Sequence, residues 1–240
     1  DYKNIRGKKV KFLTTDLSSE QAEGQIFYSD TNNDFKSIVA SAAWSAGGPM
    51  ITARKYLAGC GTQTSALAFG GAITAVSALT EEYNGSGFSA GGNLNTARRY
   101  ISGCGTQTSG LAFGGGVPPS ATISALTEEY DGSSWTESGD LDTARKALAG
   151  AGTQTSGLAF GGRVGGTTLS AATEEYGGTS WTSGGNMTTA RKYLAGCGTQ
   201  TAGLAFGGIS STTATEEYDG SSWANGGSMN NARGYLAGSG

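Results

Sequence analysis

The chain repeats one unit of 42 to 47 residues, and this repetition limits the folds that are open to it. An arginine opens each unit, and it occurs at Arg54, Arg98, Arg145, Arg191 and Arg233. From each of the first four arginines to the first glycine of a Gly-Gly pair, the distance is always 16 residues. A period of this length is typical of solenoids and propellers.

All of the length variation lies in one connector, between the Gly-Gly pair and a Glu-Glu-Tyr motif, where the spans are 11, 14, 13 and 9 residues. From the first Glu of that motif to an aromatic residue the distance is always 7, and from the aromatic residue to the next arginine it is always 10. Each unit therefore divides into four segments. We name them a (after the arginine), b (ending in Gly-Gly), c (Glu-Glu-Tyr) and d (with the aromatic residue).

Each segment has the character of a short β-strand. In the second unit, residues 99–105 and 110–115 are apolar and bounded by glycines, and Asp131-Gly132 between segments c and d suits the positive φ of a tight hairpin. No window of helical length shows an apolar period of 3.6 residues. The sequence predicts an all-β fold in which four antiparallel strands form one blade of a propeller.

The four landmarks in fixed order, Gly-Gly, Tyr, Trp and Arg, resemble the kelch repeat across residues 54–233. The resemblance implies a kelch-type β-propeller with blades at about 54–92, 98–139, 145–185 and 191–227 and a partial blade at 233–240. We expect five blades, the fifth a composite of residues 234–238 with N-terminal strands near 10–13, 25–28 and 38–45. A truncated longer propeller is the alternative.

Residues 1–46 are expected to form an attachment segment that also supplies part of the closing blade, and residues 47–240 the propeller. The first 11 residues hold five basic side chains, which form either a solvated arm or a docking segment for an acidic partner. The stretch that follows resembles a segment of bacteriophage tail-fibre and related virion proteins. The matching residues are Glu23, Gly24, Gln25, Ile26, Phe27, Tyr28 and Lys36.

Composition argues against several classes of function. The net charge is −3, which is not the footprint of a nucleic-acid-binding protein, and no apolar run is long enough to insert into a membrane. Histidine is absent, which removes Ser-His and Cys-His pairs and imidazole metal sites. Ser89 lies in a G-x-S-x-G match, but such an elbow needs a histidine partner. We predict no catalytic, cofactor or metal site, and structural thiols at Cys60, Cys104 and Cys197.

The recurring charged and aromatic residues are expected to be architectural. A partly buried arginine demands a carboxylate partner, so the repeat arginines should pair with the Glu-Glu-Tyr strands, while tyrosines and tryptophans should fill the interfaces between blades. The predicted structural residues are Arg54, Arg98, Arg145, Arg191, Glu81, Glu82, Glu128, Glu129, Glu174, Glu175, Glu216, Glu217, Tyr83, Tyr130, Tyr176, Tyr218, Trp135, Trp181 and Trp223.

The variable b–c connectors should open on the same face as the d–a connectors. Variable loops on a rigid scaffold are a common place for recognition, although tolerance of insertions at exposed loops explains them equally well. The connectors are rich in Ser, Thr and Ala, which favours a polar glycan or a protein surface as partner. The candidate recognition residues are Ile73, Thr74, Val117, Pro118, Pro119, Arg163, Val164, Ser210 and Ser211.

Together these resemblances imply a non-enzymatic bacteriophage virion protein, a tail fibre or a tail-associated protein. Its N-terminal segment would contact other virion proteins, its loop face would meet a host surface glycan or protein, and it could form a homo-oligomer. The alternatives are a cellular or secreted kelch-type interaction scaffold and, third, a glycan-processing propeller enzyme.

Overall fold

The computed structural model describes residues 12–13, 26–29, 34–37, 46–119, 122–209 and 213–238, which belong to two compact units, 1–46 and 47–240. In the first unit, β1 (Phe12–Leu13), β2 (Ile26–Ser29) and β3 (Asp34–Ser37) form a sheet in the order β1-β2-β3. β2 and β3 are antiparallel, with Ile26 opposite Ser37, and β1 runs parallel to β2.

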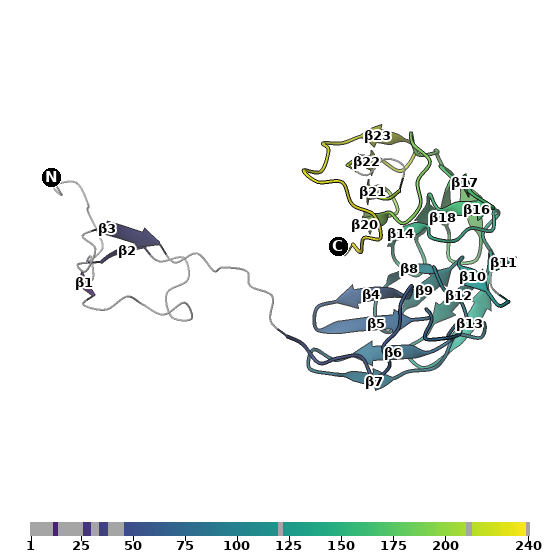
Figure 1. The fold of residues 1–240 in the computed structure, drawn as a ribbon, viewed down its shortest axis with the longest axis horizontal. Helices are drawn as coiled ribbons and strands as arrows, with labels where there is room; N and C mark the ends of the chain where they lie inside the picture. The colour runs from purple at the N-terminus through teal and green to yellow at the C-terminus, as the bar shows by residue number, and fades with distance from the viewer. Residues whose placement is uncertain are drawn as a thin grey trace. The chain divides into compact units, whose positions relative to one another are not determined.

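The second unit is a β-propeller of four-stranded antiparallel blades that follow one another around an arc (Figure 1). Blade 1 consists of β4 (Ala58–Thr62), β5 (Ser65–Phe69), β6 (Thr80–Tyr83) and β7 (Phe88–Ala90). Blade 2 consists of β8 (Ser102–Gly105), β9 (Gly110–Phe113), β12 (Thr127–Tyr130) and β13 (Trp135–Ser138).

Blade 3 consists of β14 (Ala149–Gly152), β15 (Gly157–Phe160), β18 (Thr173–Tyr176) and β19 (Trp181–Ser183). Blade 4 consists of β20 (Ala195–Thr199), β21 (Ala202–Phe206), β22 (Thr215–Tyr218) and β23 (Trp223–Asn225). Each of these sixteen blade strands falls on one of the segments a to d, so the all-β propeller that the sequence predicts is confirmed. The innermost strands β4, β8, β14 and β20 contact one another in that order.

The number of blades corrects the expectation of five. The described N-terminal strands pair among themselves as β1-β2-β3 and residues 234–238 form no strand, so the described residues contain no composite blade. The strand expected near 38–45 lies outside the described residues. Closure of that kind depends on pairing between the two ends of the chain, which the repeat pattern does not specify.

The hairpins between strands c and d form where the dipeptides predict them. In blade 2, Gly132 has φ 92° and Tyr130 lies opposite Trp135. Asp131 Oδ1 accepts the backbone N–H groups of Ser133 and Ser134, both at 2.8 Å, which closes the turn.

Two of the b–c connectors contain strands that the repeat did not predict. β10 (Gly116–Val117) pairs with β11 (Thr122–Ile123) in blade 2, and β16 (Arg163–Gly165) pairs with β17 (Thr168–Leu169) in blade 3. These are the two longest connectors, with spans of 14 and 13 residues, which gives them room for an additional strand pair.

The hydrophobic core lies between neighbouring blades. Leu67 and Phe69 of blade 1 pack in one cluster with Tyr130 and Trp135 of blade 2, and the rings of Phe69 and Trp135 are 5.0 Å apart. The Phe69 ring approaches Gly103 so closely that a Cβ there would lie 2.5 Å from Cζ, which explains a glycine in strand a. Equivalent clusters join blades 2 and 3 and blades 3 and 4. Among the described residues, no helix has the length and apolar character to cross a membrane.

Candidate functional site

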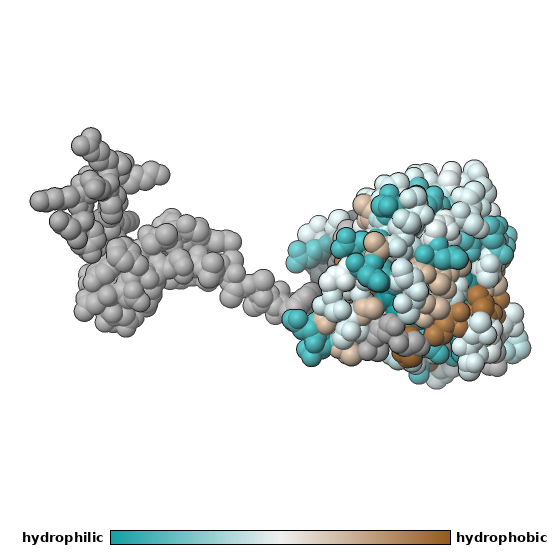
Figure 2. Space-filling view, turned by 90° about the horizontal axis from the view of Figure 1, so that it is seen from above, coloured by the Kyte–Doolittle hydropathy of each residue, from teal (hydrophilic) through white to brown (hydrophobic). Residues whose placement is uncertain are grey.

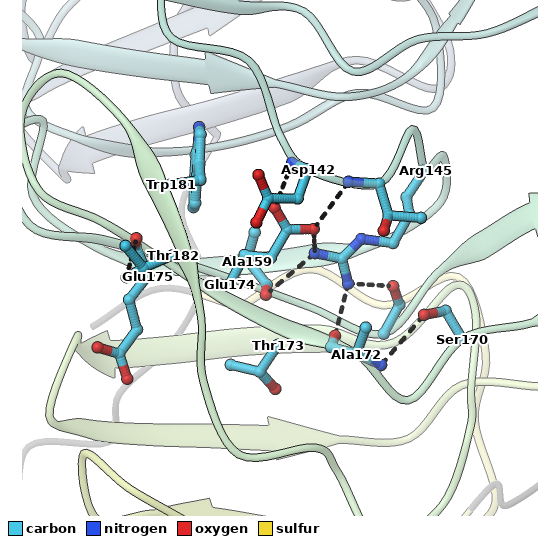
Figure 3. A network of polar contacts seen from close by, with 12 residues as sticks. Asp142, Arg145, Ala159, Ser170, Ala172, Thr173, Glu174, Glu175, Trp181 and Thr182 are labelled. Carbon is cyan, nitrogen blue, oxygen red and sulfur yellow. Dashed lines mark hydrogen bonds and ion pairs between the residues drawn. The ribbon is translucent and has the colours of Figure 1, made fainter.

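Each blade is anchored by one buried arginine. In blade 3, Arg145 Nη2 lies 2.9 Å from Glu174 Oε1, and Arg145 Nη1 donates to the carbonyl oxygens of Gly161 at 3.0 Å and Ala172 at 2.5 Å (Figure 3). The second Glu174 oxygen accepts the backbone N–H of Asp142 at 2.6 Å. Burial lowers the pKa of Arg145, and the Glu174 carboxylate opposes that shift.

The other three blades contain the same ion pair at 2.8 to 3.0 Å: Arg54–Glu81, Arg98–Glu128 and Arg191–Glu216. The pairing between the repeat arginines and the first glutamate of Glu-Glu-Tyr is therefore present as predicted. All four arginines also have a buried Nε–H with no acceptor in the described part of the chain. Identical contacts in every blade give these residues a role in the fold.

A second set of residues joins each blade to the one before it. In blade 3, the Trp181 indole N–H donates to Thr127 Oγ1 of blade 2 at 2.9 Å, and the Tyr176 hydroxyl donates to Glu129 Oε1 at 2.5 Å. Burial raises the pKa of Tyr176 to about 12, with the Glu129 bond acting in the same direction. The other two junctions contain the equivalent bonds: Trp135 to Thr80, Tyr130 to Glu82, Trp223 to Thr173 and Tyr218 to Glu175.

The two outer ends of the propeller lack these partners within the described residues. Tyr83 of blade 1 donates to the carbonyl of its own turn at Gly85, and Phe88 stands where the later blades have Trp. At the other end, Glu217 of blade 4 is exposed and accepts no tyrosine hydroxyl in the described chain. Tyr83 was predicted to fill an interface between blades and Glu217 to be a structural residue of a Glu-Glu-Tyr strand, and the structure places them at the two ends of the series.

A glutamine that the sequence reasoning missed also joins the blades. Gln154 Nε2 of blade 3 donates to the carbonyls of Tyr130 at 2.7 Å and Gly110 at 3.2 Å, and Gln107 and Gln200 make the equivalent pairs of bonds. The signal was present in the sequence, because Gly-Thr-Gln-Thr follows strand a in four copies.

The cysteines lie on the inner strands and are free thiols. Cys104 Sγ lies 3.4 Å from the carbonyl oxygen of Thr153 in the next blade, and Cys60 Sγ lies 3.5 Å from that of Thr106. Burial raises the pKa of Cys60 to about 12, which disfavours the reactive thiolate. These contacts fit structural thiols.

The b–c connectors present the candidate recognition residues at or near the surface. Ile73, Thr74, Pro118 and Pro119 are exposed, and Val117, Arg163 and Val164 are half-buried. Ser210 and Ser211 lie outside the described residues. In the view of Figure 2, the surface of the propeller is mostly pale or teal and carries one brown, hydrophobic area.

The base of every connector is fixed to the segment that enters strand a. Arg99 and Gly116 exchange backbone hydrogen bonds of 3.0 and 2.7 Å, and Lys146 and Arg163 exchange bonds of 3.1 and 2.9 Å. The same bridge joins Lys55 to Ala72 and Lys192 to Ile209. The b–c and d–a connectors therefore form one surface, and each bridge places the residue after the repeat arginine at the foot of a variable loop.

A row of tyrosines crosses this surface, and the sequence analysis did not single it out. The second residue after each repeat arginine has φ between 54° and 61°: Tyr56, Tyr100, Ala147, Tyr193 and Tyr235. The N–H of each of the last four donates to the carbonyl of the preceding one at 2.9 Å, so a single ladder of backbone bonds links all four blades. Ring centroids are 4.2 Å apart for Tyr56–Tyr100, 5.8 Å for Tyr100–Tyr193 and 4.1 Å for Tyr193–Tyr235.

Cations lie beside these rings. Lys55 Nζ is 5.6 Å from the centroid of Tyr56, Arg99 Cζ is 5.5 Å from that of Tyr100, and Lys192 Nζ is 5.4 Å from that of Tyr193. Burial and then the positive charges of Arg163 and Arg99 lower the pKa of Lys146. We call this group the tyrosine–cation hub: Tyr56, Tyr100, Tyr193, Tyr235, Lys55, Arg99, Lys146, Arg163 and Lys192.

Comparison with protein-family models and with curated proteins found no match for the chain. The likeness to kelch repeats and to virion proteins therefore depends on the residues quoted above. In the described ranges, no group of three or more His, Cys, Asp or Glu side chains is placed to hold a metal ion. The candidate site with the most distinctive chemistry in this part of the chain is the tyrosine–cation hub with its surrounding connectors.

Proposed function

We propose that this protein is a non-enzymatic bacteriophage virion component, a tail fibre or a tail-associated protein, whose propeller serves as a scaffold that presents one face to the host surface. The observation that carries the proposal is the contrast between four blades held by identical contacts and b–c connectors of 11, 14, 13 and 9 residues on that frame. A rigid scaffold with variable loops is suited to recognition.

The anchor and junction contacts support a scaffold role over an enzymatic one. Glutamates, tyrosines and arginines could serve catalysis, but here the arginine–glutamate pair recurs in all four blades and the tyrosine–glutamate bond recurs at the three junctions between them. The kelch and tail-fibre resemblances support assignment to the virion, with residues 1–46 as the segment that contacts other virion proteins.

The test is to determine whether the protein is a component of virus particles. Peptide mass spectrometry of density-purified virus particles should detect this chain in proportion to other virion proteins, and antibodies to residues 47–240 should label the tail region in electron micrographs. Pre-immune serum is the control. Recovery of the chain only from cell or secreted fractions would refute the proposal and favour a cellular kelch-type interaction scaffold.

A further inference from the structure

The charges of the propeller are separated between its hub and its outer strands. Residues 46–240 contain ten Lys or Arg, of which four are the buried anchor arginines, five belong to the tyrosine–cation hub and one is Arg233. The thirteen Asp and Glu residues all lie on strands c and d, in the turns between them or in the connector directly after strand d. Among the basic residues of 46–240 whose side chains are not buried, all but Arg233 therefore lie at the hub, namely Lys55, Arg99, Arg163 and Lys192, and the field there attracts anions.

The tyrosines of the hub occupy a backbone conformation that does not favour them. A residue other than glycine with φ near +55° is strained by about 1 to 3 kcal/mol, and glycine is the usual choice at such a position. None of the five copies has glycine there, and four have tyrosine. Ala147 adopts the same φ and makes the same ladder bonds at 2.9 Å, so the ladder itself does not require a ring.

The rings are also accessible. Tyr56 is 37% exposed and Tyr235 is 63% exposed, at the two ends of the row, while Tyr100 and Tyr193 are half-buried between them. Strained backbone that holds exposed aromatic side chains is more often found at functional sites than in purely structural positions. Strain and exposure together indicate that the tyrosines have a function other than holding the ladder.

We propose that the tyrosine–cation hub binds an acidic polysaccharide, with sugar carboxylates on Lys55, Arg99 and Lys192 and the apolar C–H faces of the sugar rings against the tyrosines. The inference depends on the proposed function, since it names the ligand class of the face presented to the host. Arginine and lysine both bind carboxylates, and charged hydrogen bonds of this kind are the stronger ones.

The neighbouring connectors suit the same ligand. Thr74, Thr122, Thr167 and Thr168 of these connectors are exposed, and their hydroxyls can both donate to and accept from sugar hydroxyls. Single-stranded nucleic acid would also seek cations and aromatic rings, so it is the competing ligand in the test. The exposed threonine hydroxyls of the connectors favour the polysaccharide, because they can bond to sugar hydroxyls.

The experiment measures binding of the full chain to immobilised polygalacturonate, with uncharged dextran as the reference. The wild-type chain should be retained by polygalacturonate and not by dextran, and 0.5 M NaCl should weaken the binding because charges carry it (~0.5 M shortens the Debye length to a few Å). Two hub variants should each weaken it by about tenfold or more: Lys55→Gln/Lys192→Gln, which removes two charges, and Tyr100→Ala/Tyr193→Ala, which copies the residue found at Ala147.

The control is Glu137→Gln/Glu217→Gln, which changes the net charge by the same magnitude but with the opposite sign, on exposed outer strands, and should leave binding unchanged. Thermal unfolding of every variant shows whether it folds. If the tyrosine variant does not fold, the binding of the lysine variant alone tests the proposal. No retention of the wild-type chain, or equal retention of the hub variants, would overturn the inference, and so would tighter binding to oligo(dT) than to polygalacturonate. Because particle localisation is measured separately, a blank binding result with the chain present in virus particles would remove the ligand and keep the proposed function.

Discussion

Removing one anchor arginine should destabilise the propeller strongly, because the arginine is fully buried and ion-paired. In Arg145→Ala, Glu174 would remain only 2% exposed with an uncompensated charge, and the carbonyls of Gly161 and Ala172 would each lose a donor. Breaking a buried ion pair by removing one partner costs about 3 to 5 kcal/mol. In a domain of this size that corresponds to a fall in Tm of about 6 to 20 °C.

Arg233 provides the matched control, because it occupies the same repeat position but is exposed. Arg233→Ala should change the free energy of unfolding by about 0.5 kcal/mol or less, as surface substitutions usually do. Differential scanning calorimetry of both variants at pH 7, with urea unfolding followed by tryptophan fluorescence, gives the comparison. Equal stability losses for the two variants would show that the buried pair does not hold the blade, and the reasoning would be wrong.

Three further predictions concern the junctions and turns. Trp181→Phe, which introduces the residue that blade 1 has at Phe88, should cost about 1 kcal/mol through loss of the indole hydrogen bond, measured by urea unfolding; no cost would mean that the bond contributes nothing. Glu129→Gln should lower Tm because it weakens the acceptor of a buried tyrosine hydroxyl, whereas Glu217→Gln should not; the reverse order would contradict the junction scheme. Hydrogen bonds from Ser134 and Ser133 lower the pKa of the Asp131 carboxyl from 3.8 to about 2, so its contribution is present above pH 3.8 and is lost as pH falls through 2. Asp131→Asn should therefore lower Tm more at pH 6 than at pH 2, and a difference as large at pH 2 as at pH 6 would refute the role of these hydrogen bonds.

Much of the propeller follows from the repeat alone, because identical spacings leave few places for strands and turns. The c–d hairpin at Asp131-Gly132 and the pair between Arg145 and Glu174 could be predicted, since a positive φ and a buried charge each allow few solutions. These features are local to one repeat. Each depends only on residues of the same repeat, and the sequence motif that produces it occurs in every copy.

Features that depend on how the blades are placed against one another could not be predicted in the same way. Nothing in the residue preferences of Tyr100 indicates φ of 54°, because its conformation is imposed by the ladder bond to the preceding blade. The dipeptide of a cation and a tyrosine after three of the repeat arginines was visible, but its meaning depends on that ladder. The expected fifth blade was wrong for a related reason, since it required pairing between distant ends of the chain.

The backbone ladder is the feature on which the whole account depends, since it joins the blades and displays the tyrosines. Hydrogen–deuterium exchange with residue-level resolution tests it directly at the amides of Tyr100, Ala147 and Tyr193, each of which donates to the preceding blade at 2.9 Å. The account predicts that these three amides exchange as slowly as those of strand b in the same blades. Exchange as fast as in the exposed b–c connectors would show that the ladder does not form and would contradict it.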